Sequence, residues 1–407
     1  MDGARTRGHP AALAAIGARI RAGAAGAVLF VGPPGIGKTT LALDLAAGLL
    51  CTAADPAARP CGTCRACRLV GGRVHPDVHL LGPEGPGRQV VIGGPGKPRG
   101  IRDLIAELAL LPVEGAARVA VVESAHRMNE DAQAALLKTL EEPPPATTII
   151  LCADAEEALL PTIRSRCARI RLGPVGVRDI EAIVTEHGAA DPPVAARAAR
   201  IAGGRPGLAL RWTRAPDALR DRDAIGRSLL DLADARPSER LAGIRALASQ
   251  ASAISTIGIE ASTAGVGDVT APPTEQPRSR SARAARPVED DAAADPGEPT
   301  DVASEDAIGP ARTPATERRR AAEALVAVWS DTTRDLLLCH AELDGSVRDL
   351  GTLDDLRAVA ARLDRDELHA FLERLSQAAV LIAGNVSPEL VLDDLALAWP
   401  RAARRAA

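Results

Sequence analysis

A glycine-rich loop near the N-terminus has the spacing of a phosphate-binding loop. It reads Gly32-Pro33-Pro34-Gly35-Ile36-Gly37-Lys38-Thr39. Glycines let backbone N–H groups turn inward around a nucleotide, Lys38 can reach the β- and γ-phosphates, and the Thr39 hydroxyl can hold Mg²⁺. The loop therefore predicts a site for ATP or ADP made by Gly32, Pro33, Gly35, Ile36, Gly37, Lys38, Thr39 and Thr40. A relic loop that no longer binds nucleotide is the alternative.

Four closely spaced cysteines follow this loop, at Cys51, Cys61, Cys64 and Cys67. A gap of two residues lets both sulfurs of a pair reach one ion, and Zn²⁺ accepts four thiolates in a tetrahedral arrangement. Four thiolates leave no open position for a substrate, so the predicted zinc site is structural. A redox-active cysteine pair is the alternative.

An acid stands where a predicted core strand ends. The apolar run at 119–122 leads directly into Glu123, which Ser124 follows. If Glu123 holds the metal, Ser124 stands where the base for the attacking water should be, and a hydroxyl does not accept that proton near neutral pH. If Glu123 is the base, Val122 occupies the metal side. Either way the site is incomplete, so we expect weak or absent hydrolysis; a plain surface acid is the alternative.

The elements that position these residues belong to a predicted parallel α/β sheet, because residues 1–175 alternate short apolar runs with helical patterns. The predicted strands are 27–31, 119–122 and 147–152, and the predicted helices include 39–50, 101–108 and 129–142. The phosphate loop joins a strand to a helix whose positive end points at the bound anion.

The remainder of the chain predicts helices on either side of a linker. Residues 176–250 read as helical with a break at 203–207, and 317–407 are helical again. Residues 251–316 carry eight Pro and many Ser, Thr, Ala and Gly. Such a segment cannot bury enough apolar surface to offset its ordering entropy, so it is expected to be disordered. Ser387 before Pro388 predicts the cap of a late helix.

Composition and charge restrict the classes of protein to which this chain can belong. The 407 residues are 46% hydrophobic but 1% aromatic, so the cores must be built from Ala, Leu, Val and Ile. A net charge of -4 gives no basic field for nucleic acid, so any DNA contact must be local or shared with partners. No apolar stretch predicts a membrane span, and Arg19 and Arg21 interrupt any signal-peptide core. We expect a cytoplasmic protein, where clustered cysteines favour metal over disulfides.

Three further stretches resemble bacterial sliding-clamp loader subunits of the AAA+ family. Residues 134–144 resemble the signature helix of that family, and 160–167 contain its Ser-Arg-Cys motif. Residues 385–390 resemble the start of a late helix in the C-terminal collar. The resemblance covers the chain except for 251–316, and it implies an AAA+ α/β P-loop core at 1–175 with a zinc module at 51–67, a helical lid at 176–250 and an all-α collar at 317–407. The disordered linker expected from composition at 251–316 would join the lid to the collar.

Three departures from the family pattern favour the delta-prime type over the ATP-hydrolysing gamma/tau motor type. The paired strand-end acids are reduced to Glu123. The second sensor arginine of the motor is replaced, because Gly204-Arg205-Pro206-Gly207 puts Gly207 in its place. The first sensor position, usually Thr or Asn, falls near Ala153 or Asp154. The intact phosphate loop, with Lys38 and Thr39, favours the motor type instead.

The resemblance implies that Arg166 acts in trans on ATP bound to a neighbouring motor subunit, where an arginine stabilises the charge of phosphoryl transfer. Pairing of Arg166 with an acid of its own domain is the alternative. The implied partners are gamma/tau and delta subunits, the sliding clamp, and primed DNA reached through the DNA polymerase III complex. Two rival functions stay open at this point: the motor subunit itself, and a non-enzymatic zinc-stapled replication adaptor.

Overall fold

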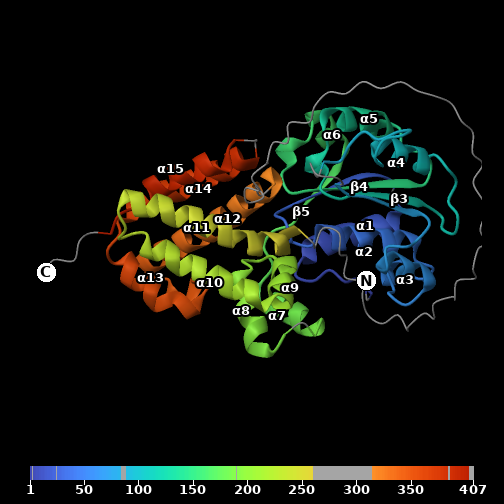
Figure 1. Cartoon of the computed structure of the whole chain (residues 1–407). Helices are drawn as coiled ribbons and strands as arrows, with labels where there is room; N and C mark the ends of the chain where they lie inside the picture. The colour runs from blue at the N-terminus through green and yellow to red at the C-terminus, as the bar shows by residue number, and fades with distance from the viewer. Residues whose placement is uncertain are drawn as a thin grey trace, which may run out of the picture.

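The computed structural model describes residues 1, 3–23, 25–83, 89–188, 190–259, 314–383 and 386–402. An α/β core lies at one end of the molecule and a wholly helical region at the other (Figure 1). Among these residues, no helix combines the length and apolar character that a membrane crossing needs.

The core is built on a parallel sheet, which confirms the predicted fold class. Its strands are β1 (Gly26–Val31), β2 (Val78–Leu81), β3 (Arg118–Val122), β4 (Thr147–Ala153) and β5 (Ala168–Arg171). They pair side by side in the order β2-β3-β4-β1-β5, and each pair is parallel. Strands β3 and β4 are buried along their whole length, as is β1 after its first residue. Burial on both faces explains why these strands read as continuous apolar runs.

Helices cover both faces of the sheet (Figure 1). One face carries α1 (Pro10–Ala22), α2 (Lys38–Leu50) and α3 (Arg65–Gly71), and the other carries α4 (Ile101–Leu108), α5 (Glu130–Glu141) and α6 (Pro161–Arg166). Each set packs on the sheet through its own hydrophobic cluster. The short 3-10 turns η1 (Pro56–Ala58), η2 (Ala125–Arg127) and η3 (Glu156–Ala158) lie in the connections.

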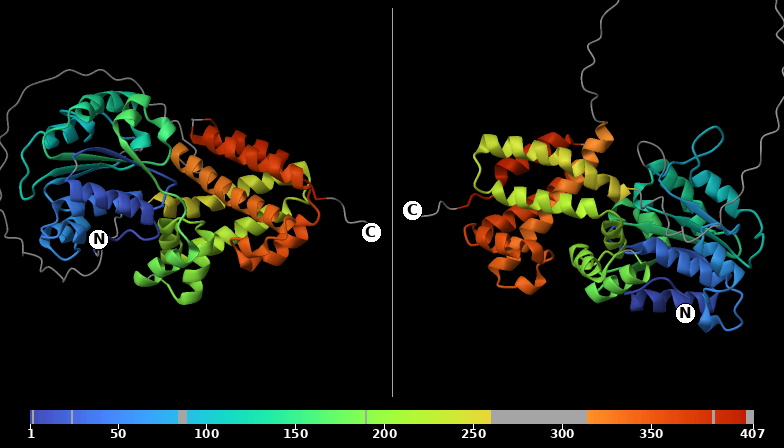
Figure 2. Two further views of the ribbon diagram at one scale, coloured as in Figure 1. Left: turned by 180° about the vertical axis from the view of Figure 1, so that it is seen from behind. Right: turned by 60° about the horizontal axis from the view of Figure 1, so that its bottom comes forward.

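The helical region is a single packed body rather than two separated ones (Figure 2). Its helices are α7 (Val177–Glu186), α8 (Pro192–Ile201), α9 (Pro206–Arg214), α10 (Pro216–Asp231), α11 (Pro237–Ile259), α12 (Ala315–His340), α13 (Leu353–Ala360), α14 (Arg365–Ala383) and α15 (Pro388–Ala398), with 3-10 turns η5 (Asp344–Ser346) and η6 (Leu350–Thr352). One hydrophobic cluster runs from Val175 to Trp399 through both the expected lid and the expected collar. Trp329, Phe371 and Trp399 meet at its centre, with ring centroids 4.8–5.5 Å apart.

The predicted linker, 251–316, extends too far at both ends. Residues 251–259 continue α11, because Ala251 and Ile254 are buried in the helical cluster, and α12 already begins at Ala315. The rest of the predicted linker, 260–313, lies outside the described residues. Ser387 does precede the first residue of α15, but its hydroxyl donates to the Glu389 carboxylate at 2.8 Å instead of capping the helix.

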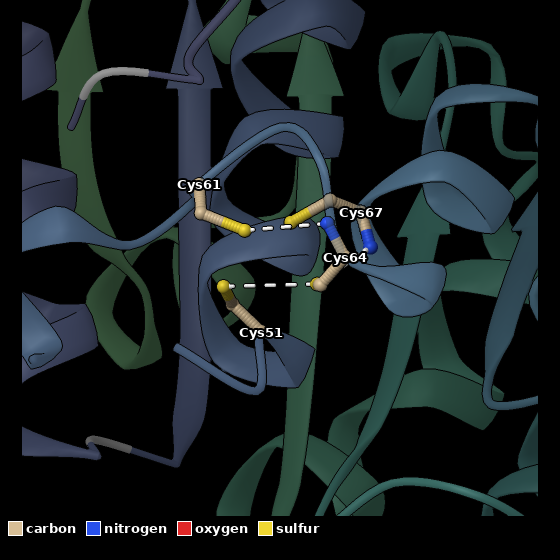
Figure 3. A group of neighbouring side chains, drawn as sticks. All are labelled: Cys51, Cys61, Cys64 and Cys67. Carbon is tan, nitrogen blue, oxygen red and sulfur yellow. Dashed lines mark hydrogen bonds between the residues drawn. The ribbon is translucent and has the colours of Figure 1, made fainter. Parts of the chain in front are cut away.

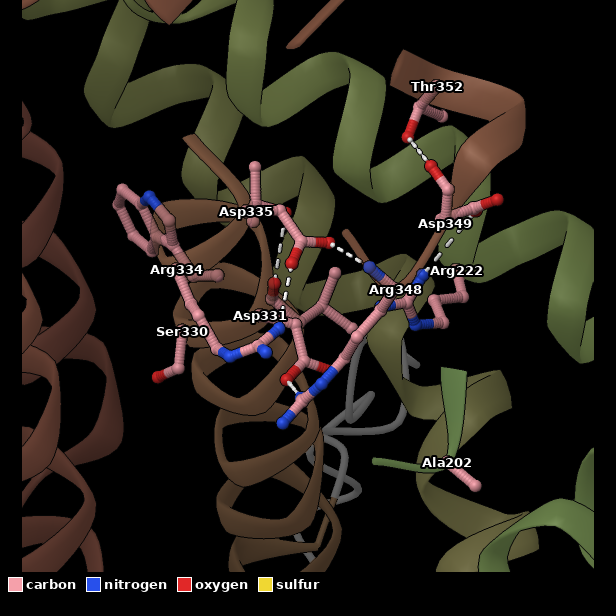
Figure 4. A network of polar contacts seen from close by, with 12 residues as sticks. Ala202, Arg222, Ser330, Asp331, Arg334, Asp335, Arg348, Asp349 and Thr352 are labelled. Carbon is pink, nitrogen blue, oxygen red and sulfur yellow. Dashed lines mark hydrogen bonds and ion pairs between the residues drawn. The ribbon is translucent and has the colours of Figure 1, made fainter. Parts of the chain in front are cut away.

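A buried network of ion pairs joins α10 to α12 and to the segment that follows α12 (Figure 4). Arg222 lies 3.3 Å from an Asp331 oxygen and 3.8 Å from an Asp349 oxygen, and Arg348 also pairs with Asp331. Asp335, beside them on α12, is 4% exposed and accepts the backbone N–H of Arg348. Burial raises the pKa of Asp335 to about 6, although the Arg334 guanidinium opposes the shift.

The raised pKa of Asp335 predicts how the helical region responds to pH. The folded state binds this proton more tightly than the unfolded chain, whose pKa is about 4, so the free energy of unfolding falls as pH rises from about 4 to about 6. Asp335→Asn is expected to remove about 2–3 kcal/mol of that fall. Trp212, Trp329 and Trp399 are the three tryptophans of the chain and all lie in the helical region.

Urea unfolding followed by tryptophan fluorescence therefore reports this region selectively. Asp366 is an exposed residue of α14, and Asp366→Asn is the matched control that should keep the pH slope of the unchanged chain. An equal slope in all three proteins would show that Asp335 does not carry the effect.

Candidate nucleotide site and cysteine cluster

The candidate nucleotide site lies at the carboxyl edge of the sheet, where the neighbouring strands β1, β3 and β4 end. Gly32, Glu123 and Asp154 are the residues that directly follow these strands. The N–H of Gly32 donates to the carbonyl of Ala153 at 3.2 Å, which ties the start of the loop to the end of β4. This edge is where open α/β sheets bind their ligands.

The predicted phosphate loop connects β1 to α2, as expected from its spacing. Gly35 and Gly37 have φ of 77° and 109°, a left-handed backbone that other residues rarely adopt. Ile36 is 1% exposed and anchors the loop in the core below it. Lys38, Thr39 and Thr40 form the first turn of α2, whose N–H groups have no partner inside the helix. The loop thus has the shape that a phosphate needs.

Lys38 is bonded entirely to its own chain. Its ammonium donates to the carbonyls of Gly32 at 2.7 Å and Pro33 at 2.8 Å, and it forms an ion pair with Asp154 at 2.6 Å. The Lys38 side chain is 8% exposed. An ammonium has three protons to donate, so these three contacts use all of them.

Asp154 is held in place by a histidine. Its backbone N–H donates to Nδ1 of His126 at 3.1 Å, which leaves the ring proton of the neutral imidazole on Nε2. Nε2 faces the Asp154 carboxylate at 3.5 Å. Burial lowers the pKa of His126, so the ring favours its neutral form. The sequence pointed only to the neighbourhood of Asp154, and neither its pairing with Lys38 nor the role of His126 was foreseen.

Glu123 directly follows the last residue of β3, and its carboxylate is paired with an arginine. Arg73 donates to it at 2.5 Å, and the Glu123 side chain is 10% exposed. Arg73 follows α3 with φ of 61°, so the loop that leaves the cysteine module carries the guanidinium to the end of β3. Ser124, which stands at the position of the second acid of the family pattern, also has a left-handed backbone, with φ of 54°.

Helix α9 lies against the phosphate loop, with the N–H of Gly207 donating to the carbonyl of Gly35 at 2.9 Å. One turn further along α9 is Arg211, which the sequence analysis did not single out. A Cβ on Gly35 would lie 3.7 Å from a terminal nitrogen of Arg211, so this guanidinium lies beside the loop. Burial and the nearby Arg205 lower the pKa of Arg211, and its Nε has no hydrogen-bond partner among the described residues.

Arg166 ends α6, on the opposite side of the sheet from α2. Its guanidinium pairs with Glu141 of α5 at 2.5 Å and donates to the carbonyl of Thr162 at 2.9 Å. The Arg166 side chain is 34% exposed and that of Glu141 is 49% exposed. The own-domain acid considered for Arg166 is therefore present, but the pair is at the surface, where such contacts are weak and readily exchanged.

The four predicted cysteines lie together, at positions that run from the end of α2 into α3 (Figure 3). Their sulfurs are all within 4.8 Å of one another, and those of Cys51 and Cys64 are 3.9 Å apart. A tetrahedron of sulfurs about 2.3 Å from one ion has edges of about 3.8 Å, so the cluster fits a zinc ion. The cluster is thus suited to metal by composition and by distance.

The pKa values of the clustered cysteines are shifted in opposite directions by their surroundings. The N–H of Cys64 and the hydroxyl of Thr63 lower the pKa of Cys61 to about 6. Burial raises the pKa of the Cys67 thiol, and burial does the same for Cys51. A cation is the partner that would favour the thiolate form at all of these positions.

The α/β core of this chain is similar to known proteins. Residues 9–176 match a family model described as "DNA polymerase III, delta subunit". The DNA polymerase III subunit delta' of Pseudomonas aeruginosa is 40% identical over 149 residues, which cover 37% of this chain and 43% of that protein. The subunit delta' of Escherichia coli is 34% identical over 184 residues, which cover 45% of this chain and 53% of that protein.

The similarity extends to a tau subunit as well. The DNA polymerase III subunit tau of Escherichia coli is 35% identical over 184 residues, which cover 44% of this chain and 27% of that protein. The matched part of this chain spans about half the length of the delta' relatives. Identity alone therefore does not separate the two types, and the residues at the site must do so.

Proposed function

We propose that the chain is the delta-prime subunit of a bacterial DNA polymerase III clamp loader, because its α/β core is similar to delta' subunits and the acid at the end of β3 is paired with an arginine. In this role it braces an ATP-driven complex of gamma/tau and delta subunits. The complex opens a sliding clamp and places it on primed DNA in the cytoplasm. The chain meets DNA through the complex, in keeping with its small net charge of -4.

The observation that carries this proposal is the ion pair between Glu123 and Arg73. Hydrolysis of a nucleotide needs a group that orients the attacking water. The only acid at the end of β3 is bonded to a guanidinium, and Ser124 next to it cannot act as a base near neutral pH. The pairing supports a subunit that hydrolyses ATP weakly or not at all, and it argues against the motor subunit.

The phosphate loop keeps the residues that a nucleotide would need. Its backbone N–H groups and Lys38 would hold the phosphates of ATP or ADP, and the Thr39 hydroxyl would hold Mg²⁺. A bound Mg²⁺ would neutralise charge on the phosphates. Because the strand-end acid is engaged, the nucleotide would be static rather than turned over.

Arg166 is the residue that would act on a neighbouring subunit. Its place at the end of an exposed helix, α6, allows it to leave Glu141 for the γ-phosphate of ATP bound next door. Exchange of a surface carboxylate for a phosphate costs little, because an exposed pair contributes about 1 kcal/mol or less. The four cysteines would hold a structural Zn²⁺ that fixes the module between α2 and α3.

The proposal is tested by assembly and turnover. The full chain is expected to co-purify with gamma/tau and delta subunits and to be required for clamp loading onto primed DNA. The isolated chain is expected to hydrolyse ATP at least about 100-fold more slowly than the assembled complex, because it lacks a free general base. Brisk hydrolysis by the chain alone, abolished by Glu123→Gln, would identify it as the motor subunit. Failure to assemble, with no nucleotide binding, would favour the adaptor.

A further inference from the structure

The ion pair between Lys38 and Asp154 affects which nucleotide the phosphate loop can bind. Lys38 gives its three protons to two loop carbonyls and to the Asp154 carboxylate. In loops of this kind the lysine serves the β- and γ-phosphates. A nucleotide can therefore engage Lys38 only by displacing one or more of these groups, and Asp154 is the one that carries charge.

The backbone of Asp154 is held beside the phosphate loop. Asp154 follows β4, the strand between β1 and β3 in the sheet, and its backbone is bonded to His126. Its carboxylate oxygens lie 2.6 Å from Lys38 and 3.5 Å from His126. Among the described residues, no arginine pairs with Asp154, so Lys38 is the cation that balances it. A displaced Asp154 carboxylate would stay beside the phosphates without that balance.

We propose that Asp154 acts as a charge filter on the phosphate loop, which selects nucleoside diphosphate over nucleoside triphosphate. The inference rests on the proposed function only in taking the loop to bind nucleotide. A triphosphate adds a third phosphoryl group next to Lys38. This group competes for the Lys38 ammonium with the Asp154 carboxylate, which is also negatively charged. A diphosphate contacts Lys38 only through its β-phosphate, so Lys38 can keep more of its ion pair with Asp154. Like charges a few ångströms apart at a partly exposed site reduce affinity by about tenfold or more.

The test compares binding of MgATP and MgADP to the full chain and to Asp154→Asn, by isothermal titration calorimetry without partner subunits. Asparagine keeps the size of the side chain and removes its charge. In the unchanged chain ADP should bind more tightly than ATP. In Asp154→Asn both affinities should rise, that of ATP by about tenfold or more and that of ADP by less, so that the ratio shifts toward ATP.

Asp366→Asn is the matched control, because it removes the same charge from an exposed position on α14 and should leave both affinities unchanged. Asp154→Ala provides a second variant, and thermal melting checks that each protein is folded. An ATP-to-ADP ratio unchanged within about twofold in both folded Asp154 variants would overturn the charge filter. Absence of nucleotide binding to either variant would overturn it too, since the freed Lys38 would then have no ligand.

The outcome is separate from that of the assembly experiment. Nucleotide binding is measured on the isolated chain, so a failure to join gamma/tau and delta subunits would leave the charge filter standing. Conversely, an unchanged ratio in the Asp154 variants would leave the assignment as a clamp-loader subunit untouched.

Discussion

Replacing Arg166 by alanine is expected to slow clamp loading by the assembled complex about 10³-fold or more, because an arginine supplied in trans contributes at least that much to phosphoryl transfer. The fold should be nearly unaffected. Arg166 is 34% exposed and its partner Glu141 is 49% exposed, so the lost pair contributes about 1 kcal/mol or less. The measurement is the rate of clamp loading onto primed DNA with the reconstituted complex, alongside the melting temperature of the isolated chain.

Two matched variants separate a trans role from a local one. Glu141→Gln breaks the same ion pair but keeps Arg166, so loading should continue at its usual rate. Arg164→Ala removes the other arginine of α6, whose side chain is less exposed, and should also load normally. If Glu141→Gln reproduces the loss seen with Arg166→Ala, the arginine acts through its own domain. Equal loading rates in all the variants would remove the trans role altogether.

The parts of the fold that the sequence predicted well are those set by local pattern. Strands β1, β3 and β4 read as continuous apolar runs because they are buried on both faces, and the glycines of the phosphate loop match a backbone that needs left-handed φ at Gly35 and Gly37. The cysteine cluster was equally readable, because the spacing of Cys61, Cys64 and Cys67 places their sulfurs near one point.

Pairings between distant segments could not be predicted in the same way. Arg73 meets Glu123 because α3 and β3 are brought together by the sheet, and Lys38 meets Asp154 because β4 lies next to β1. Both contacts depend on strand order, which no local pattern contains. Arg211 could not be predicted for a related reason: the family pattern points to position 207, whereas the arginine beside the loop is one helical turn further along α9.

Composition misled the prediction where a helix runs into a biased segment. Residues 251–259 are rich in small residues and were grouped with the Pro-rich stretch that follows them. In the structure they are the end of α11, where Ala251 and Ile254 bury their side chains against other helices. Tertiary packing decides the end of such a helix, because short side chains carry little signal of their own.

Removing zinc is the second change with a large expected effect. The cluster fixes α3, a helix of seven residues that is too short to form alone, and the N–H of Cys67 bonds to the Cys64 sulfur at its start. Without metal, four sulfurs within 4.8 Å of one another lose the ion that holds them together. We expect the core to lose about 3 kcal/mol or more, a fall of about 10 °C in its melting temperature.

The purified chain should contain about one zinc ion, as measured by elemental analysis. Hydrogen exchange followed by mass spectrometry supplies a local readout, since chelation should remove protection from residues 51–71 while leaving α12 protected. Cys64→Ser should behave like the chelated protein. Cys339→Ser, which changes a thiol on α12 far along the chain from the cluster, should keep its zinc and its protection. A zinc-free chain with an unchanged melting temperature and full protection over 51–71 would show that hydrophobic packing alone holds this module, and Arg73 would then reach Glu123 without help from a metal.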